Sequence, residues 1–394
     1  MSRVRIVADL SQLAQGGENG GAARFALDLL GALLRGGSFE ISLLASPAAI
    51  PSLAPLRALG ARVVPLQPGG EAEEPRRLRR TLRRLPPSLA RLVPDRASLR
   101  RFGADVLFSP LQSAAFHEPG LPHVAVAYDA QELHHSGFFS PAELGRRAAF
   151  RADLGRCDRV VAISEATRDD LVAHAGIRPD RVSVIHPAGP SGRRPIPADE
   201  QETRLGALGL RAGDYALYPA NFWPHKNHER LLRAMAASPV ARDPSFHLVL
   251  CGALDDRRRD VEALSASLDL GPRVLFLGYQ PDDDLTALLQ GARFLVFPSL
   301  FEGFGIPVVE AFRLGVPVAC SDLPVLREVA DGAAALFDPW DETALSRALE
   351  SLWRDAPLRA RLGAAGLEAA NRYPASEVPR LYEAVLRAPV PPGR

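Results

Sequence analysis

The chain has 394 residues, of which 47% are hydrophobic and 24% charged, a balance typical of folded globular proteins. Its formal net charge of +1 gives no strong field toward nucleic acid, so we expect no nucleic-acid partner. The sequence contains no apolar run of about 18 residues and no apolar leader after Met1. We therefore expect a cytoplasmic protein without a membrane-spanning helix.

Strands and helices alternate along the first half of the chain. Residues 4–8 predict a strand, a glycine-rich loop follows and ends at Asn19-Gly20-Gly21, and an apolar helix is expected at about 22–34. Further short apolar runs predict strands at 39–44, 62–65, 105–109, 123–128, 159–163 and 181–185. This alternation is typical of a parallel sheet that helices cover on both faces.

A second alternating series follows residues 186–197, which are rich in Pro and Gly and predict a linker. Its strands are expected at 215–218, 246–251, 273–277, 294–297, 316–319 and 334–337. We therefore expect an α/β protein of two Rossmann-like domains, residues 1–190 and 198–374, whose strand ends face each other across a cleft. The last helical stretch, about 375–388, is expected to pack back onto the first domain.

A run of arginines from Arg76 to Arg84 stands out between the third and fourth predicted strands. Leucines near helical spacing would leave the arginines on one side of a helix, and a basic amphipathic helix can lie on an anionic membrane. Two interpretations stay open: peripheral contact with an anionic membrane, or an ordinary solvated surface helix.

Lysine is nearly absent from the chain. Of 47 Lys and Arg residues only Lys226 is a lysine, and two of the four asparagines, Asn221 and Asn227, flank it. Where arginine is the default basic residue, a retained lysine indicates a position at which a planar guanidinium cannot replace a compact ammonium. An unmutated surface lysine is the alternative.

The segment with the clearest chemistry is residues 294–310, FLVFPSLFEGFGIPVVE. An apolar strand leads into a Glu-Gly-Phe-Gly turn, and a helix is expected to open near Pro307. Glycines let the backbone approach a ligand closely, and the free N–H groups of a helix N-terminus bind phosphate. Glu310, about one turn inside the helix, is placed to accept hydrogen bonds from a ribose, whereas Glu302 would face the group bonded to the diphosphate.

The two glutamates around Gly-Phe-Gly-Ile-Pro resemble the signature of the retaining family-4 glycosyltransferases, whose GT-B fold has two facing Rossmann-like domains. The resemblance implies that Glu302 contacts the donor sugar and Glu310 the nucleotide ribose. The stretch YPANFWPHKN, residues 218–227, resembles the family's loop whose lysine, here Lys226, neutralises the donor diphosphate. A third match is Gly20-Gly21-Ala22-Ala23-Arg24, which in the family faces the donor phosphates and the acceptor.

The resemblance therefore implies a set of site residues. Glu302 and Lys226 are the expected catalytic residues. The expected donor-binding residues are Glu310, Gly303, Phe304, Gly305, Ile306, Asn221, His225, Tyr279, Gly20 and Gly21. On the side of the sugar and the acceptor we expect Arg24, Tyr128, Asp129 and His134. No cofactor and no metal are expected, because the nucleotide sugar is itself the substrate.

Two positions depart from the family's pattern. Many relatives carry an arginine at the place of Asn221 or just before the lysine, where this chain has His225, so the second phosphate cation is either a histidine or missing. The family's His-Asp pair at the end of a mid-domain strand is here Tyr128-Asp129, followed by His134-His135. Either Tyr128 or one of these histidines makes the sugar contact, or activity is weakened.

Other polar groups have plainer interpretations. Asp282-Asp283-Asp284 precedes an apolar stretch, so we expect it to cap a helix rather than to bind a metal. Ser164-Glu165 is expected only to open a helix, and His134-His135 has no partner at metal-ligand spacing. The cysteines, at 157, 251 and 320, are far apart and are expected to be buried thiols.

The resemblance implies metal-independent transfer, with retention at the anomeric carbon, of a hexose or deoxyhexose to a glycan, a lipid-linked acceptor or a small molecule. The donor is expected to be GDP-mannose-like, or a UDP- or dTDP-sugar. Two alternatives stay open: a nucleotide-sugar-binding protein without catalysis, and a GT-B-fold epimerase or phosphorylase. A phosphorylase would need Lys226, the only lysine of the chain, to hold pyridoxal phosphate.

Overall fold

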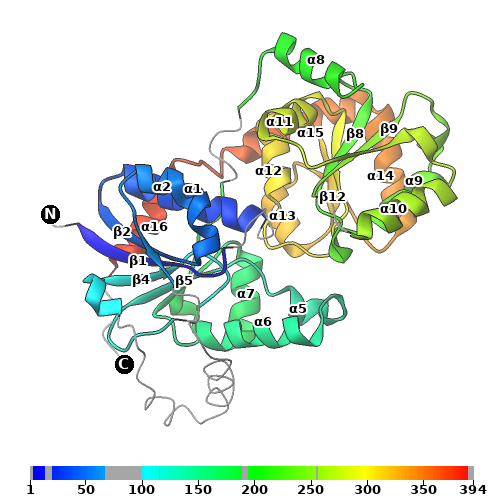
Figure 1. Cartoon of the computed structure of the whole chain (residues 1–394). Coiled ribbons are helices and arrows are strands. Elements are labelled where there is room, and N and C mark those ends of the chain that lie inside the picture. The colour runs from blue at the N-terminus through cyan, green and yellow to red at the C-terminus, as the bar shows by residue number, and fades with distance from the viewer. Residues whose placement is uncertain are drawn as a thin grey trace.

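The computed structural model describes residues 3–13, 20–66, 99–114, 116–188, 194–253 and 256–388. Figure 1 shows two lobes side by side, one from the N-terminal half of the chain and one from the C-terminal half. The arginine run from Arg76 to Arg84 lies outside the described residues. Within these ranges, every helix is too short or too polar to cross a membrane.

The first lobe is built on a parallel sheet of seven strands in the order β3-β2-β1-β4-β5-β6-β7. The strands are β1 (Val4–Leu10), β2 (Phe39–Ala45), β3 (Arg62–Pro65), β4 (Val106–Ser109), β5 (His123–Ala127), β6 (Arg159–Ala162) and β7 (Val182–Val184). β4 and β5 are buried along their whole length, as expected for a sheet covered on both faces.

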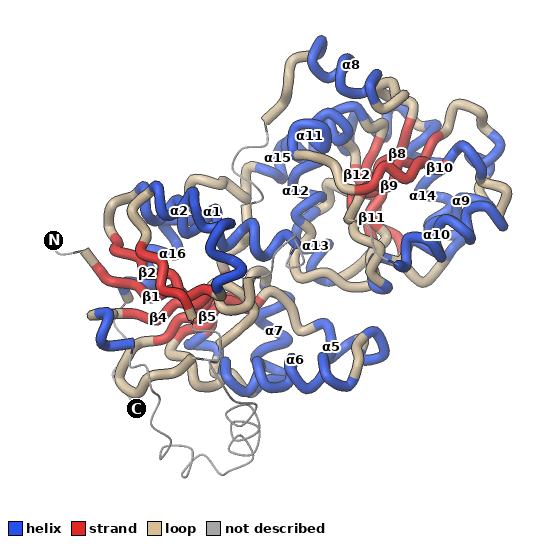
Figure 2. The backbone as a smooth tube through the Cα atoms, in the orientation of Figure 1, coloured by secondary structure: helices blue, strands red, loops and turns tan. Residues whose placement is uncertain are grey.

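Helices surround this sheet, as Figure 2 shows with strands in red and helices in blue. They are α1 (Gly20–Arg35), α2 (Ala54–Ala58), α5 (Gln131–His134), α6 (Pro141–Leu154) and α7 (Glu165–Ala175), with short 3-10 turns at Pro47–Leu53, Leu99–Phe102, Ser136–Phe138 and Pro179–Arg181. The hydroxyl of Ser164 accepts a hydrogen bond from the Thr167 amide and caps α7, so Ser164-Glu165 does open a helix as predicted.

The second lobe holds a parallel sheet of six strands in the order β10-β9-β8-β11-β12-β13. The strands are β8 (Tyr215–Pro219), β9 (His247–Cys251), β10 (Val274–Gly278), β11 (Phe294–Phe297), β12 (Val318–Ser321) and β13 (Ala335–Phe337). Its helices are α8 (Ala198–Ala207), α9 (His228–Ala237), α10 (Asp256–Ser267), α11 (Asp282–Gly291), α12 (Ile306–Arg313), α13 (Pro324–Ala330), α14 (Glu342–Arg354) and α15 (Ala356–Ala370), with 3-10 turns at Pro224–Lys226, Pro239–Arg242 and Gly271–Arg273. The predicted fold class, two parallel α/β sheets, is confirmed.

The predicted boundaries differ from the observed ones in places. The strand predicted at 316–319 lies at Val318–Ser321, because Pro317 has no N–H to donate and the ladder begins after it. The first helix begins at Gly20, two residues before the predicted start. The three cysteines are buried free thiols, as predicted.

The order of strands in both sheets brings functional loops to one edge. In the first sheet the order reverses between β1 and β4, and in the second between β8 and β11. Loops that follow strands on either side of such a reversal diverge and leave a crevice at the carboxyl edge of the sheet, where ligands bind in open α/β folds. The loops after β8 and β11 contain Lys226 and Glu302 respectively.

The final helix, α16 (Glu377–Arg387), returns to the first lobe and packs against α1. Its fully buried Tyr382 lies 6.1 Å from the ring of Phe25 and 6.0 Å from the ring of Phe108. Arg387 donates to the Ser38 carbonyl at 3.3 Å. These contacts support the proposed division into residues 1–190 plus the last helix and residues 198–374, which stays a prediction.

Replacing Tyr382 by Ala should loosen the last helix, since it removes the ring that anchors α16 in the core. We expect a loss of about 3–5 kcal/mol in the free energy of unfolding of the first lobe, the range for aromatic-to-alanine changes in cores. Tyr382→Phe is the matched control, because the Tyr382 hydroxyl is buried without a hydrogen-bond partner. The phenylalanine variant should be as stable as the parent or more so in urea unfolding. Equal destabilisation by the two changes would contradict this account.

Candidate functional site

The Glu-Gly-Phe-Gly turn joins β11 to α12, and two of its glycines are structurally required. Gly305 precedes α12 with φ +106°, a conformation that side chains with a Cβ rarely adopt. At Gly303, a Cβ would lie 2.0 Å from the carbonyl oxygen of Tyr128, just after β5 of the other lobe. The backbone of this turn therefore lies directly against the first lobe.

Lys226 and Glu302 form an ion pair, with 2.6 Å between Nζ and Oε1. Their side chains are only 13% and 11% exposed, so water screens the pair weakly. The ammonium also lies 5.8 Å from the centre of the Phe297 ring. The structure thus brings together the two residues that the sequence predicts as catalytic. Their catalytic role stays a prediction.

Hydrogen bonds between the two loops hold this pair. The Tyr218 hydroxyl donates to the Lys226 carbonyl at 2.8 Å and lies 3.2 Å from the Ser299 hydroxyl. The Leu300 amide donates to the His225 carbonyl at 2.7 Å. The first bond joins β8 to its own loop, whereas the contact with Ser299 and the bond from Leu300 connect β8 and its loop to the loop after β11.

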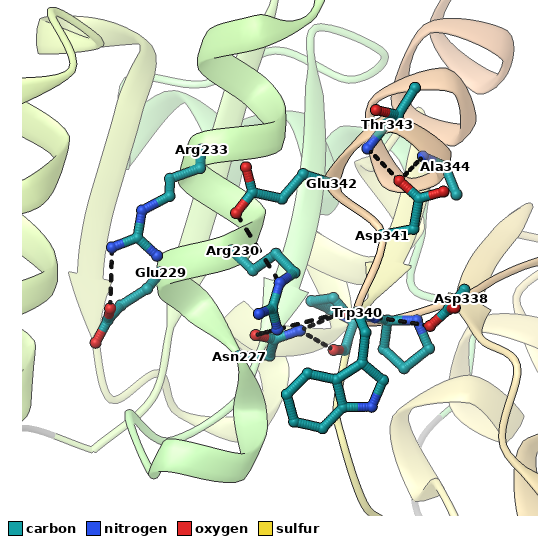
Figure 3. Close-up of polar contacts among 12 residues, drawn as sticks. Asn227, Glu229, Arg230, Arg233, Asp338, Trp340, Asp341, Glu342, Thr343 and Ala344 are labelled. Carbon is teal, nitrogen blue, oxygen red and sulfur yellow. Dashed lines mark hydrogen bonds and ion pairs between the residues drawn. The ribbon is translucent and has the colours of Figure 1, made fainter.

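Asn227 also holds the two loops together. In the sequence it stood out only as a rare residue type beside the lysine. It has φ +61°, a left-handed conformation that asparagine tolerates better than most residues. Its buried amide donates to the carbonyls of Pro298 and Pro339, both at 3.0 Å. Its side-chain oxygen accepts from Arg230 at 3.1 Å (Figure 3). Asn227 therefore shapes the loop rather than contacting a ligand.

The candidates for a second phosphate cation are both uncharged. The Asn221 side-chain oxygen accepts a hydrogen bond from the Ala253 amide at 2.8 Å. Burial, and after it the charge of Lys226, lowers the pKa of His225 to about 2, so its imidazole is neutral at pH 7. The sequence left open whether a histidine supplies this second cation or whether the site has none, and the structure favours the second alternative.

The first turns of α1 and α12 lie next to each other across the lobes. A Cβ at Gly21 would be 4.0 Å from Cδ1 of Ile306. Glu310 lies buried one turn further along α12. Adjacent helix N-termini provide free N–H groups and partial positive charge, which suit a diphosphate. Gly20, Gly21, Ile306 and Glu310 thus occupy one region and stay candidates for donor binding.

The aspartate run does not cap α11 through its side chains, which corrects the predicted detail. The N-cap is Pro281, and the three aspartates occupy the first turn, where negative charge favours the helix dipole. Asp282 forms an ion pair with Arg24 of the other lobe, and Asp284 pairs with Arg204 at 2.7 Å. Across the described ranges, no cluster of three or more His, Cys, Asp or Glu side chains could hold a metal ion.

The Tyr128 hydroxyl is engaged inside its own lobe. It donates to the Pro110 carbonyl at 2.7 Å, and burial raises the pKa of the phenol above its usual value. Asp129 accepts from Arg147 at 2.7 Å. What Tyr128 presents to the other lobe is its backbone carbonyl, so its side chain is poorly placed for the predicted sugar contact.

The two histidines after Tyr128-Asp129 do reach the second lobe. The ring of His134 stacks on that of Phe301 with 5.5 Å between centres, and its Nε2 lies 2.8 Å from Asp170. The imidazole of His135 bonds the Leu300 carbonyl at 3.2 Å, and burial lowers its pKa. Of the alternatives left open by the sequence, the histidines are the ones whose rings contact residues just before Glu302 in the chain, Phe301 and Leu300.

Phe304 and Tyr279 differ in what they can offer a ligand. Phe304 is buried, with its ring 5.5 Å from that of His186 and 5.3 Å from that of Tyr373, so only its backbone is free to face a donor. Tyr279 follows β10 and is 72% exposed, which leaves its ring open for stacking. Both stay predicted donor contacts.

One interdomain contact was missed by sequence reasoning. The carboxylate of Glu328, on α13, accepts hydrogen bonds from the amides of Glu165 and Ala166 at 2.9 and 3.3 Å and from His186 at 2.7 Å. Burial raises the pKa of Glu328, but these bonds outweigh it and the net pKa is lowered. Nothing in the sequence around Glu328 marks it, because its partners lie more than a hundred residues away.

Family models match both halves of the chain. Residues 19–188 match the model described as Glycosyltransferase Family 4, and residues 210–369 match the model described as Glycosyl transferases group 1. Together the two matches span nearly all of both lobes.

Among curated proteins, the chain is 32% identical over 217 residues to O-antigen chain mannosyltransferase B of Escherichia coli, covering 54% of this chain and 56% of the relative. It is 30% identical over 258 residues to a D-inositol 3-phosphate glycosyltransferase of Corynebacterium diphtheriae, covering 62% of this chain and 59% of the relative. The chain thus spans a little over half the length of each of these relatives.

Solved structures of similar fold include HepE of Anabaena in complex with UDP and glucose, with a TM-score of 0.75 and 21% identity over 98% of this chain and 99% of that one. WaaG, a glycosyltransferase involved in lipopolysaccharide biosynthesis, has a TM-score of 0.70 and 17% identity. The match covers 98% of this chain and 100% of WaaG. These similarities support the two-lobed fold.

Replacing Asn227 should weaken the loop that carries Lys226. Asn227→Ala removes a donor from the buried carbonyl of Pro298 and leaves that of Pro339 only the longer bond from Arg230, at 3.4 Å. It also places alanine at a positive φ, so we expect a loss of about 2–4 kcal/mol in stability. Asn227→Gly removes the same hydrogen bonds but tolerates the backbone conformation, so it should lose less. Thermal unfolding of the two variants measures the difference, and unchanged melting in both would refute the fastening role.

Proposed function

Because the chain belongs to the group 1 and family 4 glycosyltransferases, we propose that it transfers a hexose or deoxyhexose from a nucleotide sugar to an acceptor hydroxyl, with retention at the anomeric carbon. The observation that carries the proposal is the shielded pair of Lys226 and Glu302 beside the N-terminus of α12. An ammonium, the positive end of a helix and a carboxylate in one place suit a sugar diphosphate.

The donor diphosphate takes the ammonium of Lys226 and lies at the N-terminus of α12, the positive end of the helix dipole. Glu302 then exchanges its lysine partner for hydroxyl groups of the donor sugar, and the buried Glu310 accepts from the ribose. Tyr279 is proposed to stack on the base, because its ring is open to solvent just after β10, at the same edge of the sheet as the loops of Lys226 and Glu302.

Retention follows if the acceptor hydroxyl attacks the face from which the diphosphate leaves. The bond between the anomeric carbon and the diphosphate oxygen breaks, the acceptor oxygen bonds to that carbon, and the acceptor proton passes to the departing phosphate. Charge builds on the leaving diphosphate, so Lys226 and the helix N-terminus stabilise the transition state more than the ground state.

The sugar is proposed to be mannose or a related hexose, because several of the similar curated proteins are mannosyltransferases. The HepE structure with UDP-glucose supports a uridine donor as the alternative. Acceptors are proposed to be glycans, with lipid-linked and small-molecule hydroxyls as the other classes. Thermal-shift measurement with GDP, UDP, dTDP and their sugars separates the donors, since the bound ligand raises the melting temperature.

We also propose a cytoplasmic location. The three buried cysteines form no disulfide, which supports this location because cysteines of reducing compartments usually stay thiols. We propose in addition that the segment Arg76–Arg84 contacts the anionic inner face of the membrane.

A nucleotide-sugar-binding protein without catalysis is the second candidate, favoured by the uncharged His225 and the engaged Tyr128 hydroxyl. Even slow hydrolysis of a donor would exclude it. A phosphorylase requires Lys226 to carry pyridoxal phosphate, whereas Lys226 pairs with Glu302. A pyridoxal absorption band in the purified protein would support that reading.

Substitutions of Glu302 and of Glu310 should affect nucleotide binding and sugar transfer differently. Glu310→Gln should weaken binding of the free nucleoside diphosphate about 10- to 100-fold, because a charged acceptor for the ribose is lost. Glu302→Gln should bind the diphosphate at least as well as the parent, since Lys226 no longer has a carboxylate partner, while sugar transfer collapses. Calorimetry with GDP and UDP, beside turnover, measures both. Equal losses of affinity would show that the two roles are wrongly assigned.

Replacing Lys226 by Arg tests why the chain keeps one lysine. The charge survives, but the guanidinium is wider and planar and must fit a place closed by Phe297 and Glu302. We expect kcat/KM to fall by tens- to several-hundred-fold, equivalent to about 2–4 kcal/mol of transition-state stabilisation. The melting temperature is the control for folding, and full activity in the arginine variant would refute the role of Lys226.

A further inference from the structure

Five aromatic side chains from the two lobes form a contiguous group, here named the interdomain aromatic cluster: His134, His135, Phe138, Phe301 and Trp340. The ring of His135 is central. Its centre lies 5.3 Å from that of Phe138, 6.1 Å from that of Phe301 and 6.2 Å from that of Trp340. His134 joins the group by stacking on Phe301 at 5.5 Å.

The cluster is continuous with the pair of Lys226 and Glu302. Phe301 directly precedes Glu302 in the chain. Asn227, next to Lys226, donates to the carbonyl of Pro339, which directly precedes Trp340. A ligand that covers the cluster therefore reaches the proposed reacting centre.

Trp340 is fixed in place although its side chain is 55% exposed. The guanidinium of Arg230 lies 4.9 Å from the indole centre, and Arg230 is itself held by Asn227 and by Glu342, whose carboxylate is 4.0 Å away. Figure 3 shows the indole extending away from the backbone at this loop, beside Arg230.

The backbone on both sides of the indole is also tied down. The Trp340 amide donates to Asp338 at 2.8 Å, and Asp341 caps α14 by accepting from the amides of Thr343 and Ala344. A large aromatic ring that is both exposed and held rigidly is typical of binding surfaces, because ordering it costs little when a ligand arrives.

We propose that the interdomain aromatic cluster binds a sugar ring of the acceptor, with the C–H face of the pyranose on the indole of Trp340. The proposal rests on the proposed function and narrows it to saccharide acceptors. A pyranose has an apolar C–H face, which is attracted to the electron-rich face of an indole, and a rim of hydroxyl groups. The Nε2 atoms of His134 and His135 bond Asp170 and the Leu300 carbonyl, and their Nδ1 atoms offer hydrogen-bonding groups for such a rim.

The chemistry of the cluster favours this ligand over a lipid chain. A prenyl or acyl chain is best covered by a broad aliphatic surface, whereas the cluster consists of aromatic rings with polar edges. Burial lowers the pKa of His135, so at neutral pH the central ring is uncharged, which suits a neutral ligand.

Tryptophan fluorescence tests binding without any turnover. The chain has three tryptophans, and Trp353 is buried against the core. In a Trp223→Phe background, the other exposed tryptophan is removed and quenching by acrylamide reports on Trp340. We expect methyl α-mannoside, methyl α-glucoside or their α-linked disaccharides, at up to about 100 mM, to protect Trp340 from quenching.

Absence of protection by every one of these saccharides would overturn the proposal. Protection by geranyl phosphate but not by the saccharides would also overturn it, in favour of a lipid occupant. The Trp223→Phe, Trp340→Phe double variant is the control, since protection should disappear from it.

Kinetics separates the cluster from the donor site. Trp340→Ala should raise KM for a saccharide acceptor about tenfold or more and leave donor KM and donor hydrolysis unchanged, while Trp340→Phe should change acceptor KM by less than about threefold. An unchanged acceptor KM in Trp340→Ala would contradict the proposal. If the parent neither binds nucleoside diphosphates nor hydrolyses donors, the proposed function fails, whereas the fluorescence result still decides on the saccharide.

Discussion

The ion pair of Lys226 and Glu302 is the interaction around which the proposed site is organised. Two charges so little exposed are stable only with each other or with a charged ligand, because an isolated buried charge is strongly unfavourable. Their loops follow adjacent strands, β8 and β11. The loop after β11 is held to β8 and its loop by the Tyr218–Ser299 contact and by bonds from Leu300 and Asn227. The two adjacent strands therefore hold Lys226 and Glu302 side by side, where a bound diphosphate could replace Glu302 as the partner of Lys226.

Around this pair, the two lobes meet through polar contacts as well as through aromatic and apolar ones. Arg24 pairs with Asp282, and Glu328 accepts the amides that begin α7. His135 bonds the Leu300 carbonyl. Beside these polar contacts, the rings of His134 and Phe301 stack across the lobes, and the turn at Gly303 lies against Tyr128.

The fold could be predicted because buried parallel strands are continuous apolar runs, and each of the predicted runs corresponds to a strand of one of the two sheets. The Glu-Gly-Phe-Gly turn and the lone lysine were visible because their residue types are unusual at those places. The roles of Asn227, Glu328 and Trp340 were not visible. Each depends on carbonyls, amides or rings from segments distant in sequence, so the chain alone does not reveal the partner. The same limit applies to Tyr128, whose hydroxyl is taken by Pro110.

The close approach of Gly303 to the Tyr128 carbonyl has a mechanical consequence. The turn that carries Glu302 is also a point of close backbone contact between the two lobes. A rotation between the lobes changes the contact of this turn with Tyr128, so the geometry of the proposed donor site depends on the orientation of the lobes. Donor capture and lobe position would therefore change together, without any dedicated signalling segment between them.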